Sequence, residues 1–328
     1  MKEALYYEKS DNKRVHCHLC PVECVISDGK AGNCRVRYNN AGVLYSKITD
    51  RVSGLGMDPI EKKPLYHFMP GRSILSIGTM GCNFHCKFCQ NADISQTGDL
   101  ELDEVDPASL LEMARQKDSI GIAFTYTEPS IWIETILDIA PVFTKAGLKN
   151  VLVTNGYFNR KPLDDILPYI DAMNIDVKAF REDFYRKVCG AKLKPVLENV
   201  EYLHDKTHLE LTMLIVPTLN DDMKEIAEFV DWVAGMDREI PVHFSRYFPR
   251  YQMDHEATPE RTLAAAFEYA RKRLAHVYVG NIRIPGAEDT VCASCGNLLI
   301  SRSAYLAEIK GMKGGSCSKC GKTVKGVF

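Results

Sequence analysis

The sequence lacks the features that mark membrane proteins, exported proteins and nucleic-acid-binding proteins. None of its apolar runs approaches the roughly 20 residues that a membrane-spanning helix needs. Residues 1–13 are polar and of mixed charge, unlike a signal or transit peptide. The 41 basic and 43 acidic side chains leave a formal net charge of −2, which gives no reason to expect nucleic acid or an anionic membrane as a partner. We therefore expect a cytoplasmic protein.

Cysteine, in contrast, is abundant. The chain has 12 cysteines among 328 residues, a length that suggests about two domains. In a reducing cytoplasm, cysteines grouped in C-x2-C pairs indicate metal ligands rather than disulfides. All but Cys189 fall into three groups, so three metal sites are the simplest interpretation. The groups are Cys17, Cys20, Cys24 and Cys34; Cys82, Cys86 and Cys89; and Cys292, Cys295, Cys317 and Cys320.

The central group lies on one short loop, directly after the apolar run Ile74–Ile77 and its turn glycines. Three thiolates can hold three irons of a four-iron cluster, and the loop provides no fourth thiolate. The fourth iron would then be free to bind a substrate. Phe88 gives the loop an apolar face against which a base could lie. The alternative, a structural zinc knuckle, needs a second pair of ligands, and only His85 stands within reach.

Residues 1–70 form a predicted N-terminal module. Its four cysteines fit a tetrahedral zinc ion or a second iron–sulfur cluster, and of the two we favour zinc. His16 and His18 are expected beside the site or at the surface rather than as ligands. Residues 38–44 predict a hairpin with an Asn-rich turn. The segment Asp58–His67, polar and interrupted by prolines, predicts a linker to the next domain.

Residues 71–285 alternate between strand and helix patterns, which predicts an α/β fold with a parallel sheet flanked by helices. Because the chain contains no Gly-x-Gly-x-x-Gly motif, we predict a partial (β/α)6 barrel of the TIM type rather than a dinucleotide-binding fold. The predicted strands are 74–77, 121–126, 150–154, 173–177, 209–216 and 241–245, with a short seventh at 277–279. The predicted helices are 130–145, 222–234 and 259–274.

Residues 286–328 form a predicted C-terminal module. Two C-x2-C-G motifs stand 21 residues apart, a pattern typical of a zinc ribbon. A rubredoxin-like iron site is the alternative. In either case we expect a structural or partner-binding module.

Polar residues follow the apolar strands of the predicted barrel. The carboxyl ends of parallel strands converge on the active mouth of such a barrel, so these residues should gather beside the central cysteine loop. Together they predict a cradle for a cofactor. The residues are Thr127, Glu128, Asn155, Asp176, Lys178 and His243.

The cysteine loop and these strand ends resemble the radical S-adenosylmethionine enzymes that include the glycyl-radical-enzyme activases. In that family a Gly-Gly-Glu-Pro stretch binds the amino group of the cofactor; here Thr125–Pro129 retains Glu128 and the proline but neither glycine. The resemblance implies that Asn155 contacts the ribose and that His243 lies near the methionyl end. It also implies that Asp176 and Lys178 line the substrate or cation side.

The resemblance narrows at residues 62–71, 81–83, 89–91 and 243–246. With both flanking cysteine modules, these look like the radical enzyme of the AmmeMemoRadiSam system, over essentially the whole chain. That family implies a 4Fe–4S cluster, S-adenosylmethionine, and reductive cleavage to a 5′-deoxyadenosyl radical that takes hydrogen from a substrate. It also implies AMMECR-type and Memo-type partner proteins, and an electron donor such as flavodoxin or ferredoxin.

Two alternatives remain at this stage. A glycyl-radical-enzyme activase would act on a partner enzyme, although here the extra cysteines precede the central group instead of being inserted after it. A non-catalytic, zinc-stabilised binding module would explain the outer cysteine groups but not the central one. Cys189 is either a substrate-side thiol or a buried structural cysteine.

Overall fold

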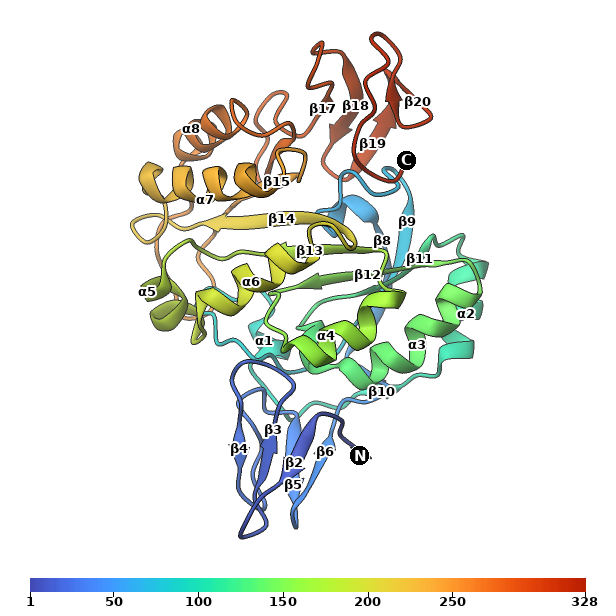
Figure 1. Cartoon of the computed structure of the whole chain (residues 1–328), viewed down its shortest axis with the longest axis vertical. Helices are drawn as coiled ribbons and strands as arrows, with labels where there is room; N and C mark the ends of the chain where they lie inside the picture. The colour runs from blue at the N-terminus through green and yellow to red at the C-terminus, as the bar shows by residue number, and fades with distance from the viewer.

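An eight-stranded mixed sheet forms the centre of the protein, and the computed structural model describes every residue from Met1 to Phe328 (Figure 1). The strand order is β16-β15-β14-β13-β12-β11-β9-β8. Neighbouring strands from β9 to β16 are parallel, and β8 is antiparallel to β9. The strands are β8 (Gly54–Pro59), β9 (Ser73–Gly78), β11 (Gly121–Phe124), β12 (Lys149–Thr154), β13 (Ala172–Asp176), β14 (His208–Ile215), β15 (Val242–Arg246) and β16 (Val277–Gly280).

Helices connect the parallel strands, as the alternating pattern predicts. The predicted helix at 222–234 is present as α7, with Ile226, Phe229, Val230 and Val233 on its buried face. The helix α2 begins where Asp106 accepts hydrogen bonds from two backbone amides and Pro107 occupies the first turn. The helices are α1 (Ala92–Ser95), α2 (Pro107–Gln116), α3 (Ile133–Lys145), α4 (Arg160–Ile166), α5 (Glu182–Phe184), α6 (Leu193–Leu203), α7 (Met223–Met236) and α8 (Glu260–Ala270).

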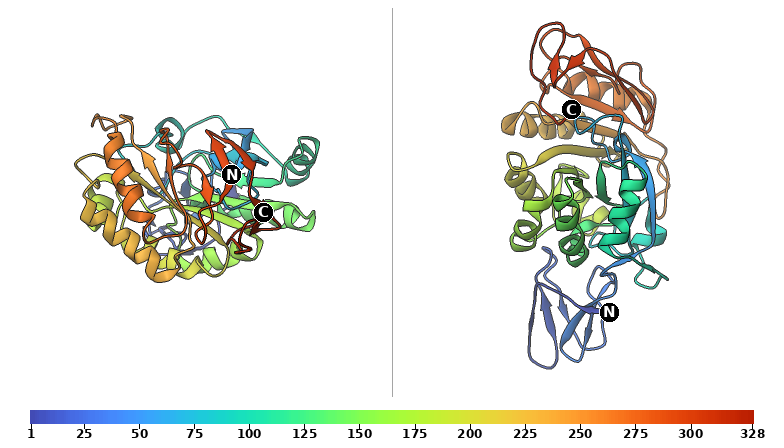
Figure 2. Two further views of the ribbon diagram at one scale, coloured as in Figure 1. Left: turned by 90° about the horizontal axis from the view of Figure 1, so that it is seen from above. Right: turned by 90° about the vertical axis from the view of Figure 1, so that its right-hand side faces the viewer.

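The two cysteine-rich ends of the chain lie at opposite ends of the long axis, with the sheet between them (Figures 1 and 2). The predicted hairpin is present: Asn40 pairs with Val43, and both turn residues, Ala41 and Gly42, have positive φ, as a two-residue type I′ turn requires. The N-terminal strands are β1 (Lys2–Glu3), β2 (Tyr7–Lys9), β3 (Val15–Cys17), β4 (Val25–Ile26), β5 (Arg37–Asn40), β6 (Val43–Ser46) and β7 (Arg51–Val52), which pairs with β10 (Asp103–Glu104).

The C-terminal end is built from short antiparallel strands. β18 is the central strand of a three-stranded sheet, in which β17 and β19 are the edges. The strands are β17 (Thr290–Val291), β18 (Leu298–Ser303), β19 (Leu306–Ile309), β20 (Met312–Lys313) and β21 (Ser316–Cys317). No helix anywhere in the chain combines the length and the apolar character needed to cross a membrane.

The predicted linker at Asp58–His67 is wrong. Its first residues end the edge strand β8, and three of its ionisable side chains are buried: Asp58 is 8% exposed, Lys63 1% and His67 0%, whereas Lys62 is exposed. The segment is polar in sequence, but each of these side chains finds a partner in another part of the fold. Lys63 pairs with Asp58 at 2.7 Å, and the imidazole of His67 hydrogen-bonds the hydroxyl of Tyr278 at 2.6 Å.

Candidate active site

One cavity of about 850 Å³ opens on the carboxyl side of the parallel strands. It gathers all the residues that the sequence analysis assigned to the central cluster and its cofactor. They come from five different loops or strands and from positions up to 161 residues apart, so the fold alone brings them together. They are Cys82, Cys86, Cys89, Phe88, Thr127, Glu128, Asn155, Asp176, Lys178 and His243.

The three central cysteines stand on the loop after β9, and their environment fits an iron–sulfur cluster. The backbone N–H of Phe84 points at the sulfur of Cys82 at 3.3 Å, and the hydroxyl of Ser95 lies 3.1 Å from the sulfur of Cys89. Donors aimed at sulfur stabilise thiolates, the form that binds iron. The cavity contains no fourth cysteine, so the donor set leaves one iron without a protein thiolate.

His85 does not complete a zinc knuckle. Its Nδ1 contacts the side-chain oxygen of Gln96 at 3.0 Å, and its Nε2 contacts that of Asn33 at 2.9 Å. Both ring nitrogens therefore have partners other than the three sulfurs. The structure disfavours the zinc-knuckle alternative for this loop.

The loop rests on the segment that carries Cys189. The backbone amides of His85 and Lys87 donate to the carbonyls of Cys189 (2.8 Å) and Val188 (3.0 Å). Cys189 itself is fully buried and does not line the cavity. Of its two predicted alternatives, the structure shows the buried structural cysteine.

Glu128 is buried at the start of the turn that follows β11. Its Oε1 accepts from the N–H of Ser130 at 2.9 Å and from the hydroxyl of Thr154, and its Oε2 accepts from the N–H of Asn155 at 2.8 Å. Burial raises the pKa of Glu128, and these hydrogen bonds oppose the rise. A carboxylate offers about four lone-pair sites, so one acceptor site remains for a ligand in the cavity.

Asn155 connects β12 to the cysteine loop. Its side-chain Nδ2 donates to the amide oxygen of Asn83 at 2.8 Å, and its Oδ1 accepts from the N–H of Tyr157 at 3.0 Å. Asn83 in turn donates to the hydroxyl of Ser130 at 2.9 Å. The side chains that follow β11 and β12 therefore hold the residue next to Cys82 in place.

Asp176 and Lys178 form an ion pair at 2.7 Å on the cavity wall. Burial works to lower the pKa of Lys178, but the neighbouring Asp176 carboxylate and Cys86 raise it. The lysine therefore stays charged and supplies a positive charge beside the cysteine loop. That charge favours thiolates at the cluster site.

His243 lies deeper in the fold than predicted. It is the second residue of β15 rather than a residue at the carboxyl end, and its Nε2 contacts Glu210 at 2.7 Å. Glu210 also accepts from His208 and from the backbone amides of Tyr66 and His67. Burial works to raise the pKa of Glu210, but the hydrogen bonds from His208 and His243 hold it well below its usual range.

The sequence analysis missed Glu210 and the Asp58–Lys63–Tyr126 network. Glu210 interrupts the apolar run of β14, and a charged residue in a buried strand is a signal that could have found it. Lys63 pairs with Asp58 and with the hydroxyl of Tyr126 at 3.1 Å, and burial lowers the pKa of Lys63 to about 8. Tyr126 lines the cavity, so this network fixes part of its wall.

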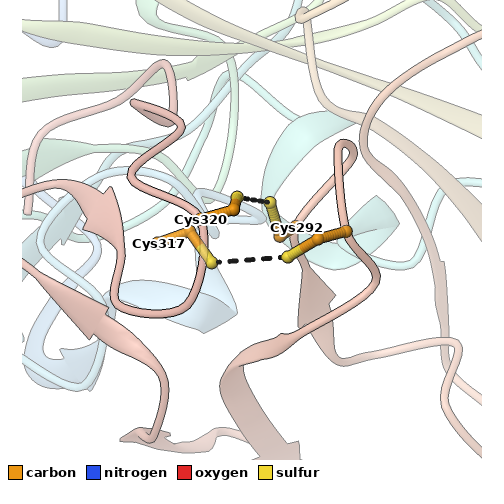
Figure 3. A group of neighbouring side chains, drawn as sticks. Cys292, Cys317 and Cys320 are labelled. Atoms are coloured by element: carbon orange, nitrogen blue, oxygen red, sulfur yellow. Dashed lines mark hydrogen bonds between the residues drawn. The ribbon is translucent and has the colours of Figure 1, made fainter.

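The two outer cysteine groups differ in spacing. In the C-terminal group, the sulfurs of Cys292 and Cys320 lie 3.6 Å apart and those of Cys295 and Cys317 3.7 Å apart (Figure 3). All four lie within 4.8 Å of one another, so this group could hold a metal ion. The N-terminal group, Cys17, Cys20, Cys24 and Cys34, surrounds a small cavity instead.

His16 and His18 are at the surface, as predicted, and contact carboxylates rather than cysteines. His16 lies 3.1 Å from Glu23, and His18 lies 2.7 Å from the same carboxylate. With Glu8 they form a group of possible ligands on the outside of the module. The N-terminal cysteine site is therefore a four-thiol site.

The C-terminal module also reaches the large cavity. The turn between β18 and β19, residues 303–305, lines the same cavity as the cysteine loop. Arg302, at the base of this turn, donates to the carbonyl of Tyr66 at 2.7 Å and to the hydroxyl of Thr290 at 2.7 Å. The module thus forms part of the wall of the site.

We compared the chain with known protein families and with related proteins. The family description that matches is the radical SAM superfamily, over residues 76–230. Uncharacterized protein MJ0808 of Methanocaldococcus jannaschii is 41% identical over 99% of both chains. Pyruvate formate-lyase 1-activating enzyme of Escherichia coli is 25% identical over 58% of this chain and 77% of its own.

Among solved structures, SuiB of Streptococcus suis, bound to S-adenosylmethionine, aligns with a TM-score of 0.52 at 12% identity. The match covers 69% of this chain and 53% of that one. At this identity the likeness concerns the fold, an α/β fold with a parallel sheet. The chain contains a radical SAM superfamily domain, and it is homologous to the activating enzymes of glycyl-radical enzymes.

Proposed function

We propose that this protein cleaves S-adenosylmethionine reductively at a 4Fe–4S cluster held by Cys82, Cys86 and Cys89. The observation that carries the proposal is the convergence of three cysteines, with no fourth, on one cavity lined by the predicted cofactor residues. Such a cluster supplies an electron that breaks a carbon–sulfur bond of the cofactor, and the resulting 5′-deoxyadenosyl radical takes a hydrogen atom from a substrate.

Different residues around the cysteines are assigned to different parts of S-adenosylmethionine. The remaining acceptor site of Glu128 suits the ammonium group of the methionyl part, since the other three sites already hold N–H or O–H donors. Phe88 offers an apolar face for the adenine, Asn155 is assigned to the ribose, and Thr127 is a further cofactor-binding residue; all three line the cavity. The chain thereby orients the cofactor against the open iron.

Asp176 and Lys178 are assigned to the substrate or cation side of the cavity, and His243 to the methionyl end of the cofactor. His243 uses Nε2 on Glu210, which leaves Nδ1 as the ring atom that can face a ligand. Asp176 and Lys178 form an ion pair near Cys86. The turn of residues 303–305 narrows the opening, which helps to exclude water and oxygen from a radical.

The finer assignments complete the proposal. We interpret the parallel strands as a partial (β/α) barrel and assign zinc to the C-terminal cysteine group, whose sulfur spacing of 3.6 and 3.7 Å matches a tetrahedral ion. The assigned partners are AMMECR-type and Memo-type proteins, with a flavodoxin or a ferredoxin as electron donor.

Activation of a glycyl-radical enzyme is the second candidate. The homology to pyruvate formate-lyase 1-activating enzyme favours it, but that match covers 58% of this chain, whereas the 41% identical relative covers 99%. The two candidates share the chemistry at the cluster and differ in the substrate.

Product analysis after anaerobic reconstitution with iron and sulfide tests the proposal. With a reductant and S-adenosylmethionine, the protein should form 5′-deoxyadenosine, and Cys86→Ala should reduce this at least about 100-fold because it removes a cluster ligand. Cys189→Ala, which removes the thiol that contacts Cys86 but does not line the cavity, is the matched control and should retain cleavage. Full cleavage by Cys86→Ala would overturn the proposal.

A further inference from the structure

The spacing of the N-terminal thiols does not suit a single zinc ion. A tetrahedral zinc with Zn–S bonds of 2.3 Å holds its sulfurs about 3.8 Å apart, as the C-terminal group does at 3.6 and 3.7 Å. No three of the sulfurs of Cys17, Cys20, Cys24 and Cys34 lie within 4.8 Å of one another. The same is true of the central cysteines, Cys82, Cys86 and Cys89.

A hollow lies between the N-terminal thiols. The four cysteines surround a cavity of about 10 Å³, room for roughly one water molecule. Its other walls are largely apolar and include Leu19, Ile26 and Ile131. A cube of irons and sulfides binds each thiolate through a different iron, so it holds its thiolates farther apart than one ion does. The cube is larger than this hollow, so the four thiols must move apart to admit it.

An unsatisfied donor borders this hollow. Arg37 is 1% exposed, and its Nη atoms pair with Glu134, but its Nε–H has no hydrogen-bond partner. A buried N–H without a partner costs roughly 1–3 kcal/mol. A metal-bound thiolate or a cluster sulfide would accept from it, so the donor indicates a metal site between these thiols. The N–H of Asn33 already points at the sulfur of Cys24 at 3.4 Å.

The N-terminal site lies against the central cysteine loop. Asn33, next to Cys34, donates to the carbonyl of Asn83 at 2.9 Å and contacts the ring of His85 at 2.9 Å. Asn83 lines the N-terminal cavity and directly follows Cys82 in the chain. A Cβ atom placed on Gly81 would stand 2.7 Å from the carbonyl oxygen of Cys34. The two cysteine sites are thus separated by one layer of residues.

We propose that Cys17, Cys20, Cys24 and Cys34 bind a second 4Fe–4S cluster, which relays single electrons to the central cluster. One electron enters from a reduced carrier protein of the flavodoxin or ferredoxin class, which is oxidised by one electron. The same electron then passes through the Asn33–Asn83 contact to the central site. No proton or bond is exchanged. The relay rests on the function proposed above, but the second cluster does not.

Iron and zinc counts on the full-length, anaerobically reconstituted protein test the cluster. We expect about eight irons and one zinc per chain, and about four irons in a variant with Cys82, Cys86 and Cys89 all replaced by alanine. Four irons and two zincs in the wild type, with no iron in the triple variant, would overturn the inference while leaving the central cluster in place. Iron retained by the triple variant supports the second cluster even if the protein does not cleave S-adenosylmethionine.

The choice of reductant tests the relay. In Cys17→Ala/Cys20→Ala, cleavage driven by reduced flavodoxin should fall at least tenfold, while cleavage driven by dithionite, a small molecule, should be retained. Retained dithionite activity also shows that the variant is folded. Asn33→Ala is a milder second variant that should keep about eight irons and slow only the flavodoxin-driven reaction. Unchanged flavodoxin-driven cleavage in both variants would overturn the relay.

Discussion

Among single residues, Glu210 makes four buried polar contacts behind the candidate site. Its carboxylate accepts from two imidazoles and two backbone amides, at full burial. Glu210→Gln places an NH₂ group against these donors, so we expect the free energy of unfolding to fall by about 3 kcal/mol. Urea denaturation measures the loss. Glu228→Gln, which removes an exposed ion pair with Arg181, is the control and should have little effect; equal losses in both would contradict the assignment.

His276 gives the fold a dependence on pH. Burial lowers the pKa of His276 to about 4, from 6.5. Between these two values the unfolded chain binds a proton that the folded chain does not, so stability decreases as the pH falls from 6.5 to about 4. We expect His276→Gln to show a smaller loss of unfolding free energy between about pH 7 and pH 5 than the wild type. Parallel pH profiles for the two proteins would refute this.

At the scale of elements, the contact between the N-terminal module and the central cysteine loop depends on Gly81. It has φ +83°, and a Cβ there would stand 2.6 Å from Val36 and 2.7 Å from the Cys34 carbonyl. We expect Gly81→Ala to displace the loop and to cost most of the bound iron after reconstitution. Gly147→Ala is a matched control, because Gly147 also has positive φ (+75°) but has open space around it. Equal iron in the two variants would show that the contact is unimportant.

Helices and strands that depend on local residue patterns could be predicted from the sequence, whereas segments held by distant partners could not. The strands, the helix α7 and the hairpin of β5 and β6 depend on local patterns of apolar and turn residues, and these predictions agree with the structure. The segment Asp58–His67 was predicted as a linker because its charges look solvated. Its partners, such as Tyr126 and Tyr278, lie far along the chain, and no local pattern reports them.

In the candidate site, too, local features could be predicted and distances between distant residues could not. The cysteine spacings are local, and they predicted three groups that the fold does bring together. The sequence spacing of the cysteines does not determine the distances between their sulfurs. C-x2-C pairs occur both in the C-terminal group, whose sulfurs are close together, and in the N-terminal group, whose sulfurs are farther apart. The choice between zinc and a second cluster at the N-terminal group therefore stays a matter of proposal, and only the pairing of strands brings Glu210 against His243.

For the whole molecule, the C-terminal module lines part of the large cavity, so we expect this module to shield the cluster site from solvent and air. Arg302 fixes the module to the central sheet through the carbonyl of Tyr66, at full side-chain burial. We expect Arg302→Met to loosen the turn of residues 303–305, with faster hydrogen exchange in that turn and bleaching of the cluster by air at least several-fold faster. The exposed Arg271→Met is the control. Unchanged exchange and bleaching would mean that the module does not shield the site.

The central claim is that the iron without a protein thiolate binds S-adenosylmethionine. Electron paramagnetic resonance of the dithionite-reduced protein, recorded with and without S-adenosylmethionine, tests it most directly. The account predicts that the cofactor changes the signal of the cluster held by Cys82, Cys86 and Cys89, and that the change is absent in the variant with these three replaced by alanine. A cluster signal that is present in the wild type but identical with and without the cofactor would contradict it.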